Sequence, residues 1–148
     1  MANDVRVFRE LHDAVIKAVG ARLFTISAMN MQEAVARRAY TSHPIDYPNT
    51  GVKEIFADEW TEHVMKGGKS FIANTTAEFV PYFPDHAQIN ALGCHSAMNI
   101  PVFDAGEVIG TVNLLDDEMH FAPAVAEKAE ALVRQYEARL IPPLRAAL

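Results

Sequence analysis

Six residues in the second half of the chain are candidates for metal binding or nucleophilic chemistry. They are one thiol, three imidazoles and two carboxylates: Cys94, His86, His95, His120, Asp116 and Asp117. A zinc site usually draws two ligands from one short motif, such as two cysteines two residues apart or two histidines three residues apart. The six residues contain no such pair, and histidines scattered singly are more often surface or core residues than ligands. We therefore expect no metal site and no other cofactor.

Covalent catalysis also has little support in the sequence. Cys94 is the only cysteine, so the chain has neither an internal disulfide nor a second thiol with which to run a dithiol redox cycle. The G-x-S-x-G elbow of serine hydrolases and the phosphate-binding P-loop are both absent. The segment KGGK at 66–69 is too short to cradle phosphates and predicts the end of a helix and a turn. We expect no catalytic residue, and a non-enzymatic function.

Composition and charge exclude two classes of partner. The 148 residues suffice for one domain with a substantial core, and half of them are hydrophobic, but no apolar run approaches the ~20 residues of a membrane span. The net charge is −6 and the 13 Lys and Arg residues are not clustered, unlike those of a nucleic-acid-binding protein. We expect neither a membrane nor a nucleic acid as partner. The start of the chain lacks the apolar segment of a signal peptide, which with the lone cysteine predicts a cytoplasmic protein.

Apolar periodicity predicts a helix at each end of the chain and strands between them. Asn3 can cap the first helix and Gly20 can end it, whereas the last helix begins near Pro123 and should stop at Pro142-Pro143. The full set of expected elements is, in chain order, helix 3–19, strands 23–29 and 33–41, helix 52–65, strand 70–73, helix 85–91, strands 96–103 and 107–115, and the helix from 123. The segment 42–51, with two prolines and a glycine, is an expected loop.

The strands at 96–103 and 107–115 are separated by Asp104-Ala105-Gly106, which predicts a β-hairpin because glycine tolerates the positive φ of a tight turn. If Phe103 faces Val108, residues whose numbers add up to 211 face each other. This register places Met98 opposite Asn113 and Ile100 opposite Thr111 on one sheet face. The other face is small and apolar except for Asn99, as expected beneath helices.

Residues 92–115, which include the segments Asn-Ile-Pro-Val and Val-Ile-Gly-Thr-Val-Asn-Leu-Leu, resemble the C-terminal half of a GAF domain. The resemblance covers nearly the whole chain but is specific only in this stretch. It implies a single GAF domain over residues 2–148 with an α+β, PAS-like fold. The expected architecture is an antiparallel sheet of five or six strands, with the N- and C-terminal helices on one face and a ligand pocket on the other. It also implies a role in sensing small molecules.

The resemblance assigns the sheet face that carries Met98, Thr111 and Asn113 to the pocket. The segment that would cover this face is rich in aromatic and histidine side chains, which suit a flat or hydrophobic ligand held by a few polar groups. We expect ligand contacts from its members that combine a ring with a polar tip: Tyr47, Trp60, Tyr82 and His86. Two alternatives remain: the rings fill the space themselves, or Thr111 and Asn113 only bond to the loop backbone.

Three specialised GAF chemistries fit the sequence poorly. Phe83-Pro84-Asp85-His86 is similar to a segment of the free methionine-R-sulfoxide reductases, but Ile89 stands where that family has a cysteine. Bilin attachment would require Cys-His where this chain has Pro84 and Asp85. The motif that follows the last hairpin strand in cyclic-nucleotide-binding members is matched only in part, from Asn113 to Asp116.

The sequence therefore predicts a regulatory or sensory GAF domain that binds a small molecule non-covalently and acts in signal transduction. The alternatives are a dimerisation or interaction module without a ligand and, third, a sulfoxide-reductase-like enzyme. Because the sequence contains no output domain, we expect a signal to pass through a homodimer formed by the terminal helices. The apolar residues expected on the free flank of these helices are Val7, Ala14, Ala18, Val133, Ile141 and Leu144.

Overall fold

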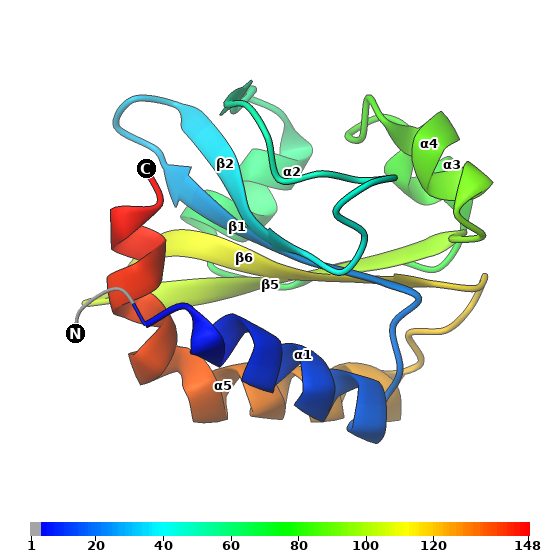
Figure 1. Ribbon diagram of the computed structural model, residues 1–148. Helices are drawn as coiled ribbons and strands as arrows, with labels where there is room; N and C mark the ends of the chain where they lie inside the picture. The colour runs from blue at the N-terminus through cyan, green and yellow to red at the C-terminus, as the bar shows by residue number, and fades with distance from the viewer. Residues whose placement is uncertain (1–3) are drawn as a thin grey trace.

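A six-stranded antiparallel sheet forms the centre of the molecule in a computed structural model that describes residues 4–148 (Figure 1). The strand order is β3-β2-β1-β6-β5-β4, with every neighbouring pair antiparallel. The strands are β1 (Leu23–Asn30), β2 (Val35–Thr41), β3 (Lys53–Glu54), β4 (Phe71–Ala73), β5 (Ser96–Asp104) and β6 (Glu107–Asp116). The predicted α+β class is confirmed. The predicted N-cap, Asn3, lies outside the described residues.

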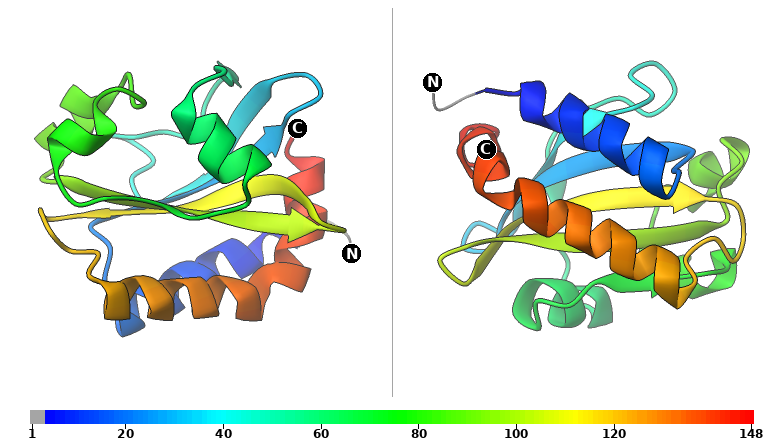
Figure 2. Two further views of the ribbon diagram at one scale, coloured as in Figure 1. Left: turned by 180° about the vertical axis from the view of Figure 1, so that it is seen from behind. Right: turned by 90° about the horizontal axis from the view of Figure 1, so that it is seen from below.

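Two long helices, α1 (Arg6–Ala18) and α5 (Pro123–Ala146), lie side by side on one face of the sheet (Figures 1 and 2). The apolar face of α1 is buried against the sheet, and α5 runs beneath β5 and β6. Neither helix, nor any other in the part of the chain that the structure describes, combines the length and apolarity needed to cross a membrane. The largest hydrophobic core therefore lies between these two helices and the sheet.

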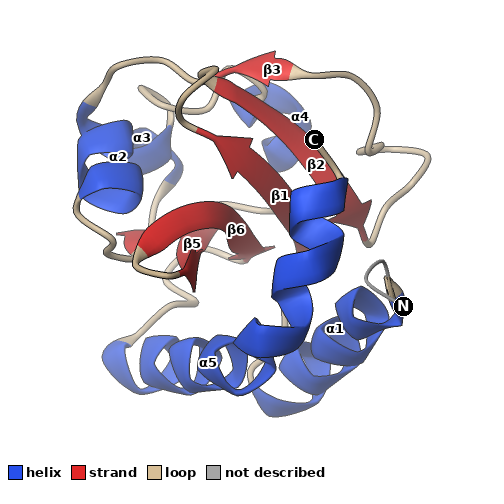
Figure 3. Ribbon diagram, turned by 90° about the vertical axis from the view of Figure 1, so that its left-hand side faces the viewer, coloured by secondary structure: helices blue, strands red, loops and turns tan. Residues whose placement is uncertain are grey.

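The last helix is longer than predicted, because it continues through Pro142 and Pro143 to Ala146. Figure 3 shows that α5 bends before its final turns. Proline keeps a helical φ but removes one hydrogen bond and clashes with the preceding turn, so it bends a helix more readily than it ends one when packing holds the far side. Here Leu144, after the prolines, is fully buried in the core and supplies that packing.

The other face is covered by short elements joined by loops (Figure 1). They are α2 (Glu59–Thr61), the π-helical turn η1 (Glu62–Lys66), α3 (Thr76–Phe79) and α4 (His86–Ala91). The helix predicted over 52–65 begins only at Glu59, because Asp58 caps it by accepting a hydrogen bond from Thr61 N at 2.9 Å. Residues 52–54 are exposed and have no apolar face to bury, and two of them form the edge strand β3.

The β5–β6 hairpin contains a one-residue irregularity that the sequence analysis did not predict. Phe103 faces Val108 as expected, but the register shifts between Val102 and Phe103, so that Val102 pairs with Gly110 and Ile109 is the extra residue of a β-bulge. Beyond the bulge, residues whose numbers add up to 212 face each other. A shift of one residue turns every side chain of one strand to the opposite face.

Half of the six residues predicted to form a dimer patch lie in the core. Val7, Val133 and Leu144 are all at most 1% exposed and pack between the helices and the sheet. The patch prediction was wrong for these three, because α1 and α5 use two adjacent sides to pack, one on the sheet and one on each other. The exposed large apolar residues of α1 and its N-cap are Ile16 and Val5. Homodimerisation stays a prediction, to be tested by light scattering against the 16.4 kDa mass of one chain.

Gly110, beside the bulge, packs too closely for any side chain. A Cβ at this position would lie 2.6 Å from the Ser27 carbonyl oxygen and 3.0 Å from Leu144 Cδ1. We expect Gly110→Ala to lower the free energy of unfolding by about 2–3 kcal/mol, as overpacked core substitutions do. Chemical denaturation measures this loss.

Gly106→Ala is the matched control, because a Cβ there meets no atom within 4 Å and only the positive φ of +82° opposes it. Its cost should be limited to backbone strain, about 1 kcal/mol. A Gly110→Ala protein as stable as the parent would contradict the close packing of β6 on β1 and α5.

Candidate functional site

A cavity of about 570 Å³ lies on the sheet face opposite α1 and α5. Its floor consists of polar side chains from β1, β5 and β6, namely Thr25, Ser27, Asn99, Thr111 and Asn113. Its walls come from β2 and from the covering segments 47–61 and 82–89. This volume is within the range of small-molecule sites in proteins.

A chain of hydrogen bonds runs along the cavity floor. Trp60 Nε1 donates to Asn99 Oδ1 at 2.8 Å, and Asn99 Nδ2 donates to Asn113 Oδ1 at 2.8 Å. Asn113 Nδ2 then donates to Thr25 Oγ1 at 3.1 Å and Ser27 Oγ at 3.3 Å. Asn99 is 5% exposed and Asn113 8%, so an unpaired amide at either position would cost about 1–3 kcal/mol. The chain of bonds removes this cost.

A cluster of charged side chains lies at another part of the wall. The Arg38 guanidinium stacks over the Tyr47 ring at 3.8 Å and donates to the Pro48 carbonyl oxygen at 2.7 Å. The Asp85 carboxylate accepts a hydrogen bond from the Tyr47 hydroxyl. It also lies 3.8 Å from Arg38 and 3.7 Å from Lys53. The cluster joins strands β2 and β3 to the start of α4.

Burial, together with the negative charge of Asp85, raises the pKa of Tyr47 far above its usual value. Tyr47 therefore stays a neutral phenol at any physiological pH and acts as a hydrogen-bond donor to Asp85. An acid–base role for this hydroxyl is accordingly disfavoured. Its position instead holds the carboxylate in place between the two cations.

Five of the seven residues predicted to contact a ligand line the cavity: Tyr47, Trp60, Tyr82, Thr111 and Asn113. The alternative in which Asn113 bonds only to loop backbone is wrong. Its partners are the sheet side chains of Asn99, Thr25 and Ser27. The one backbone oxygen that it contacts belongs to Thr111 in its own strand. The second alternative, a face filled by its own aromatic rings, is contradicted by the open volume. Whether the five residues bind a ligand stays a prediction.

Met98 and His86 do not belong to the cavity lining. Met98 pairs with Leu114 and is buried in the core beneath α1 and α5, so its assignment to the pocket face was wrong. The bulge at Ile109 is the physical reason, because it moves Asn99 rather than Met98 onto the cavity side. His86 is half-buried at the first position of α4, next to Asp85, which lines the cavity in its place.

The sequence analysis missed most of the lining residues, among them the polar or charged Thr25, Ser27, Arg38 and Asn99. The adjacent apolar pair Val108-Ile109 breaks the alternation expected of a strand, but Leu114-Leu115 in the same strand does so without a bulge, so the sequence did not single out the bulge that turns Asn99 to the cavity. For Arg38 the sequence also held no signal, because Arg37 precedes it and either arginine could have faced the pocket.

A family model for the GAF domain matches residues 5–140 of the chain. This protein belongs to the GAF domain family. The predicted family and fold are thereby confirmed, with the terminal helices and the cavity on opposite faces of the sheet. No curated protein matches the GAF chain in sequence.

Solved structures share the fold of this GAF domain at low sequence identity. A GAF domain/HD domain protein from Geobacter sulfurreducens has a TM-score of 0.77 at 12% identity, covering 98% of this chain and 96% of that one. The GAF domain of a two-component sensor histidine kinase from Bacillus halodurans has a TM-score of 0.70 at 9% identity, covering 99% and 96%. Free methionine-R-sulfoxide reductase from Neisseria meningitidis, solved with its substrate, has a TM-score of 0.64 at 16% identity, covering 95% and 80%.

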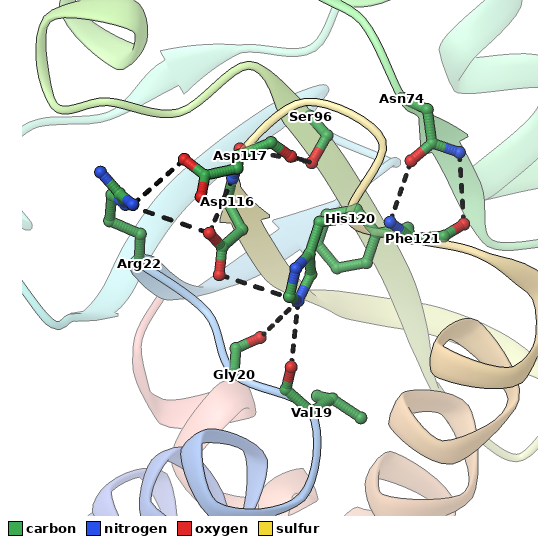
Figure 4. Close-up of polar contacts among 9 residues, drawn as sticks. All are labelled: Val19, Gly20, Arg22, Asn74, Ser96, Asp116, Asp117, His120 and Phe121. Atoms are coloured by element: carbon green, nitrogen blue, oxygen red, sulfur yellow. Dashed lines mark hydrogen bonds and ion pairs between the residues drawn. The ribbon is translucent and has the colours of Figure 1, made fainter.

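Three of the candidate metal ligands, Asp116, Asp117 and His120, take part in structural contacts at the end of β6 and in the loop before α5 (Figure 4). His120 Nε2 lies 3.0 Å and 3.2 Å from the carbonyl oxygens of Val19 and Gly20 and 3.7 Å from Asp116, whereas Asp117 pairs with Arg22 at 3.1 Å. Nearby, the Asn74 amide brackets Phe121 by bonding to both its N–H and its carbonyl group. Within residues 4–148, no three His, Cys, Asp or Glu side chains are placed to hold a metal ion. These contacts fasten the loop before α5 to the end of α1 and to β4.

Cys94 is fully buried together with Leu23 and Ile89 in a second core cluster, separate from the one beneath α1 and α5. It is not among the cavity-lining residues. Burial raises the pKa of its thiol to about 11. At pH 8 only roughly one molecule in a thousand then carries the reactive thiolate. Ellman's reagent should therefore label the native protein very slowly, and faster as the pH rises towards 11.

The same protein unfolded in guanidinium chloride is the control, because its exposed thiol has an ordinary pKa and should react within minutes. Rapid labelling of the folded protein at pH 7 would contradict the burial of Cys94. It would also restore the case for thiol chemistry in this GAF domain.

Proposed function

We propose that this GAF domain is a regulatory domain that binds a small organic molecule non-covalently in the cavity. The observation that carries the proposal is the buried row of amides and hydroxyls on the cavity floor. Burying Asn99 and Asn113 costs desolvation free energy, whereas apolar side chains at these positions would stabilise the fold without that cost. Such a row does supply oriented hydrogen-bonding groups to an occupant of the cavity, which is how ligand sites achieve specificity.

The aromatic wall supports a ligand with a flat or apolar part. Tyr47, Trp60, Tyr82 and Phe83 line the cavity, and the Phe56 side chain at its edge is 60% exposed. An exposed aromatic ring beside a polar floor is favoured when a ligand covers it. The GAF domains of similar fold that come from a sensor histidine kinase and an HD-domain protein agree with a regulatory role.

Attachment through a thioether and reductase chemistry are both disfavoured. Each needs a reactive thiol within reach of the occupant, and Cys94, the only cysteine of the chain, lies outside the cavity lining with its pKa raised by burial. The fold shared with the Neisseria meningitidis reductase therefore does not extend to its activity in this proposal.

Trp60 offers a direct test, because it is the only tryptophan of the chain and its indole N–H is part of the floor network. A library of neutral, cationic and anionic metabolites should contain at least one compound that raises the melting temperature. The same compound should change Trp60 fluorescence with saturation, because an occupant alters the surroundings of the indole.

Ala36→Phe is the blocking variant, since Ala36 lines the cavity and a larger side chain there would occupy its volume. Ala138→Phe on the exposed side of α5 is the matched control. The compound should lose at least tenfold in affinity for the first variant and none for the second. A library without any stabiliser, or a hit equally affected by both variants, would contradict the proposal.

A further inference from the structure

The hydrogen-bond chain on the cavity floor has a single direction, and Trp60 sets it. An indole N–H donates and cannot accept, so the Asn99 group that faces it must be the carbonyl oxygen. Asn99 then presents its NH₂ to Asn113, whose own carbonyl oxygen must accept. Both amide orientations therefore follow from the one donor at the end of the chain.

The far end of this chain presents hydrogen-bond donors to the cavity. Asn113 Nδ2 uses lone pairs of Thr25 Oγ1 and Ser27 Oγ as acceptors. Each of these hydroxyls keeps its own hydrogen, which must point away from Asn113. Both residues line the cavity. The floor is therefore suited to a ligand whose atoms accept hydrogen bonds, such as carbonyl, carboxylate or ring-nitrogen atoms.

The charged part of the wall carries a local excess of one positive charge. Arg38 and Lys53 both lie near the same oxygen of the single carboxylate of Asp85, at 3.8 Å and 3.7 Å. A tight charge-assisted hydrogen bond measures about 2.7–2.9 Å, so neither contact is a close one. The Arg38 side chain is only 15% exposed, and a buried cation favours a full counter-charge.

Two other carboxylates, Glu54 and Asp58, also line the cavity. Asp58 is engaged in capping α2 through Thr61 N, and Glu54 is exposed on the edge strand β3. Neither forms an ion pair with Arg38 or Lys53 among the described residues. The excess positive charge beside Asp85 is therefore open to an anion from solution.

We propose that the cavity recognises an organic anion. Its carboxylate or phosphate group pairs with Arg38 and Lys53, and acceptor atoms in the rest of the molecule take the hydroxyl hydrogens of Thr25 and Ser27. This inference rests on the proposed function, because it names the ligand class of the same cavity. The hydrogen bond from the Tyr47 hydroxyl holds the Asp85 carboxylate in place when the anion pairs with Arg38 and Lys53.

The experiment titrates acetate and inorganic phosphate against chloride at constant ionic strength, and nicotinate against its neutral amide, nicotinamide. Melting temperature and the Arg38 side-chain NMR signal report binding. We expect a saturable, anion-specific rise in melting temperature and a shift of the Arg38 signal. Acetate and phosphate separate a carboxylate site from a phosphate site, and nicotinate should bind at least tenfold more tightly than nicotinamide.

Arg38→Met should weaken anion binding at least tenfold, whereas Arg37→Met, a change of the neighbouring exposed arginine in the same strand, should leave it unchanged. Lys53→Met covers the case in which Arg38→Met does not fold, because the Lys53 side chain is 62% exposed and its loss should weaken binding about threefold without affecting the fold.

Anions that stabilise the protein no more than chloride, or equal effects of the two arginine variants, would overturn this inference. If neutral library compounds still change Trp60 fluorescence in that case, the proposed function stands and only the ligand class is wrong. If no compound of any charge binds, both proposals fail.

Discussion

The extra residue in β6 is the constraint on which both faces of the sheet depend. Without the bulge at Ile109, the hairpin would pair Met98 with Asn113 and would turn Asn99 into the helix-covered core. A buried amide beneath α1 and α5 would meet only apolar neighbours, at a cost of about 1–3 kcal/mol. With the bulge, Met98 fills that core and Asn99 faces Asn113 across the cavity floor.

The two faces of the sheet consequently serve different purposes, one forming the core and the other a cavity. On one side, α1 and α5 bury a continuous apolar core, and the bent end of α5 places Leu144 against Gly110. On the other side, short helices and loops leave a cavity whose polar floor is internally hydrogen-bonded. Because the first side is closely packed and supplies the stability, the second can hold open volume.

The polarity of the cavity comes from residues that are far apart in sequence. Trp60 on the covering segment directs the amides of β5 and β6, and these in turn orient the hydroxyls of β1. The charged cluster similarly joins Arg38 on β2 to Asp85 before α4. The floor presents hydrogen-bond donors and the cluster presents positive charge to the same space, and the proposal of an anionic ligand rests on this agreement.

The sequence by itself determined the elements whose signals are local. The turn at 104–106 predicts the hairpin, and the apolar stripes predict the terminal helices, because turn chemistry and apolar periodicity act within a few residues of each other. The resemblance of residues 92–115 to the GAF family implied the rest of the architecture. Tyr47, Trp60 and Tyr82, predicted as rings with polar tips, line the cavity, and so do Thr111 and Asn113, predicted from the alternation of the hairpin strand. These features need no knowledge of distant partners.

Only the tertiary structure decided the rest. The bulge depends on how β6 packs against β1 and α5, so the register beyond Val102 could not be read from the hairpin alone. Pro142 and Pro143 bend α5 rather than end it because Leu144 gains burial in the core beyond them. Arg38 and Asp85 meet across 47 positions of sequence, and the direction of the floor network follows from a tryptophan 39 positions from its asparagine partner. Contacts of this kind carry no local signal, because their energy exists only once the chain has brought the partners together.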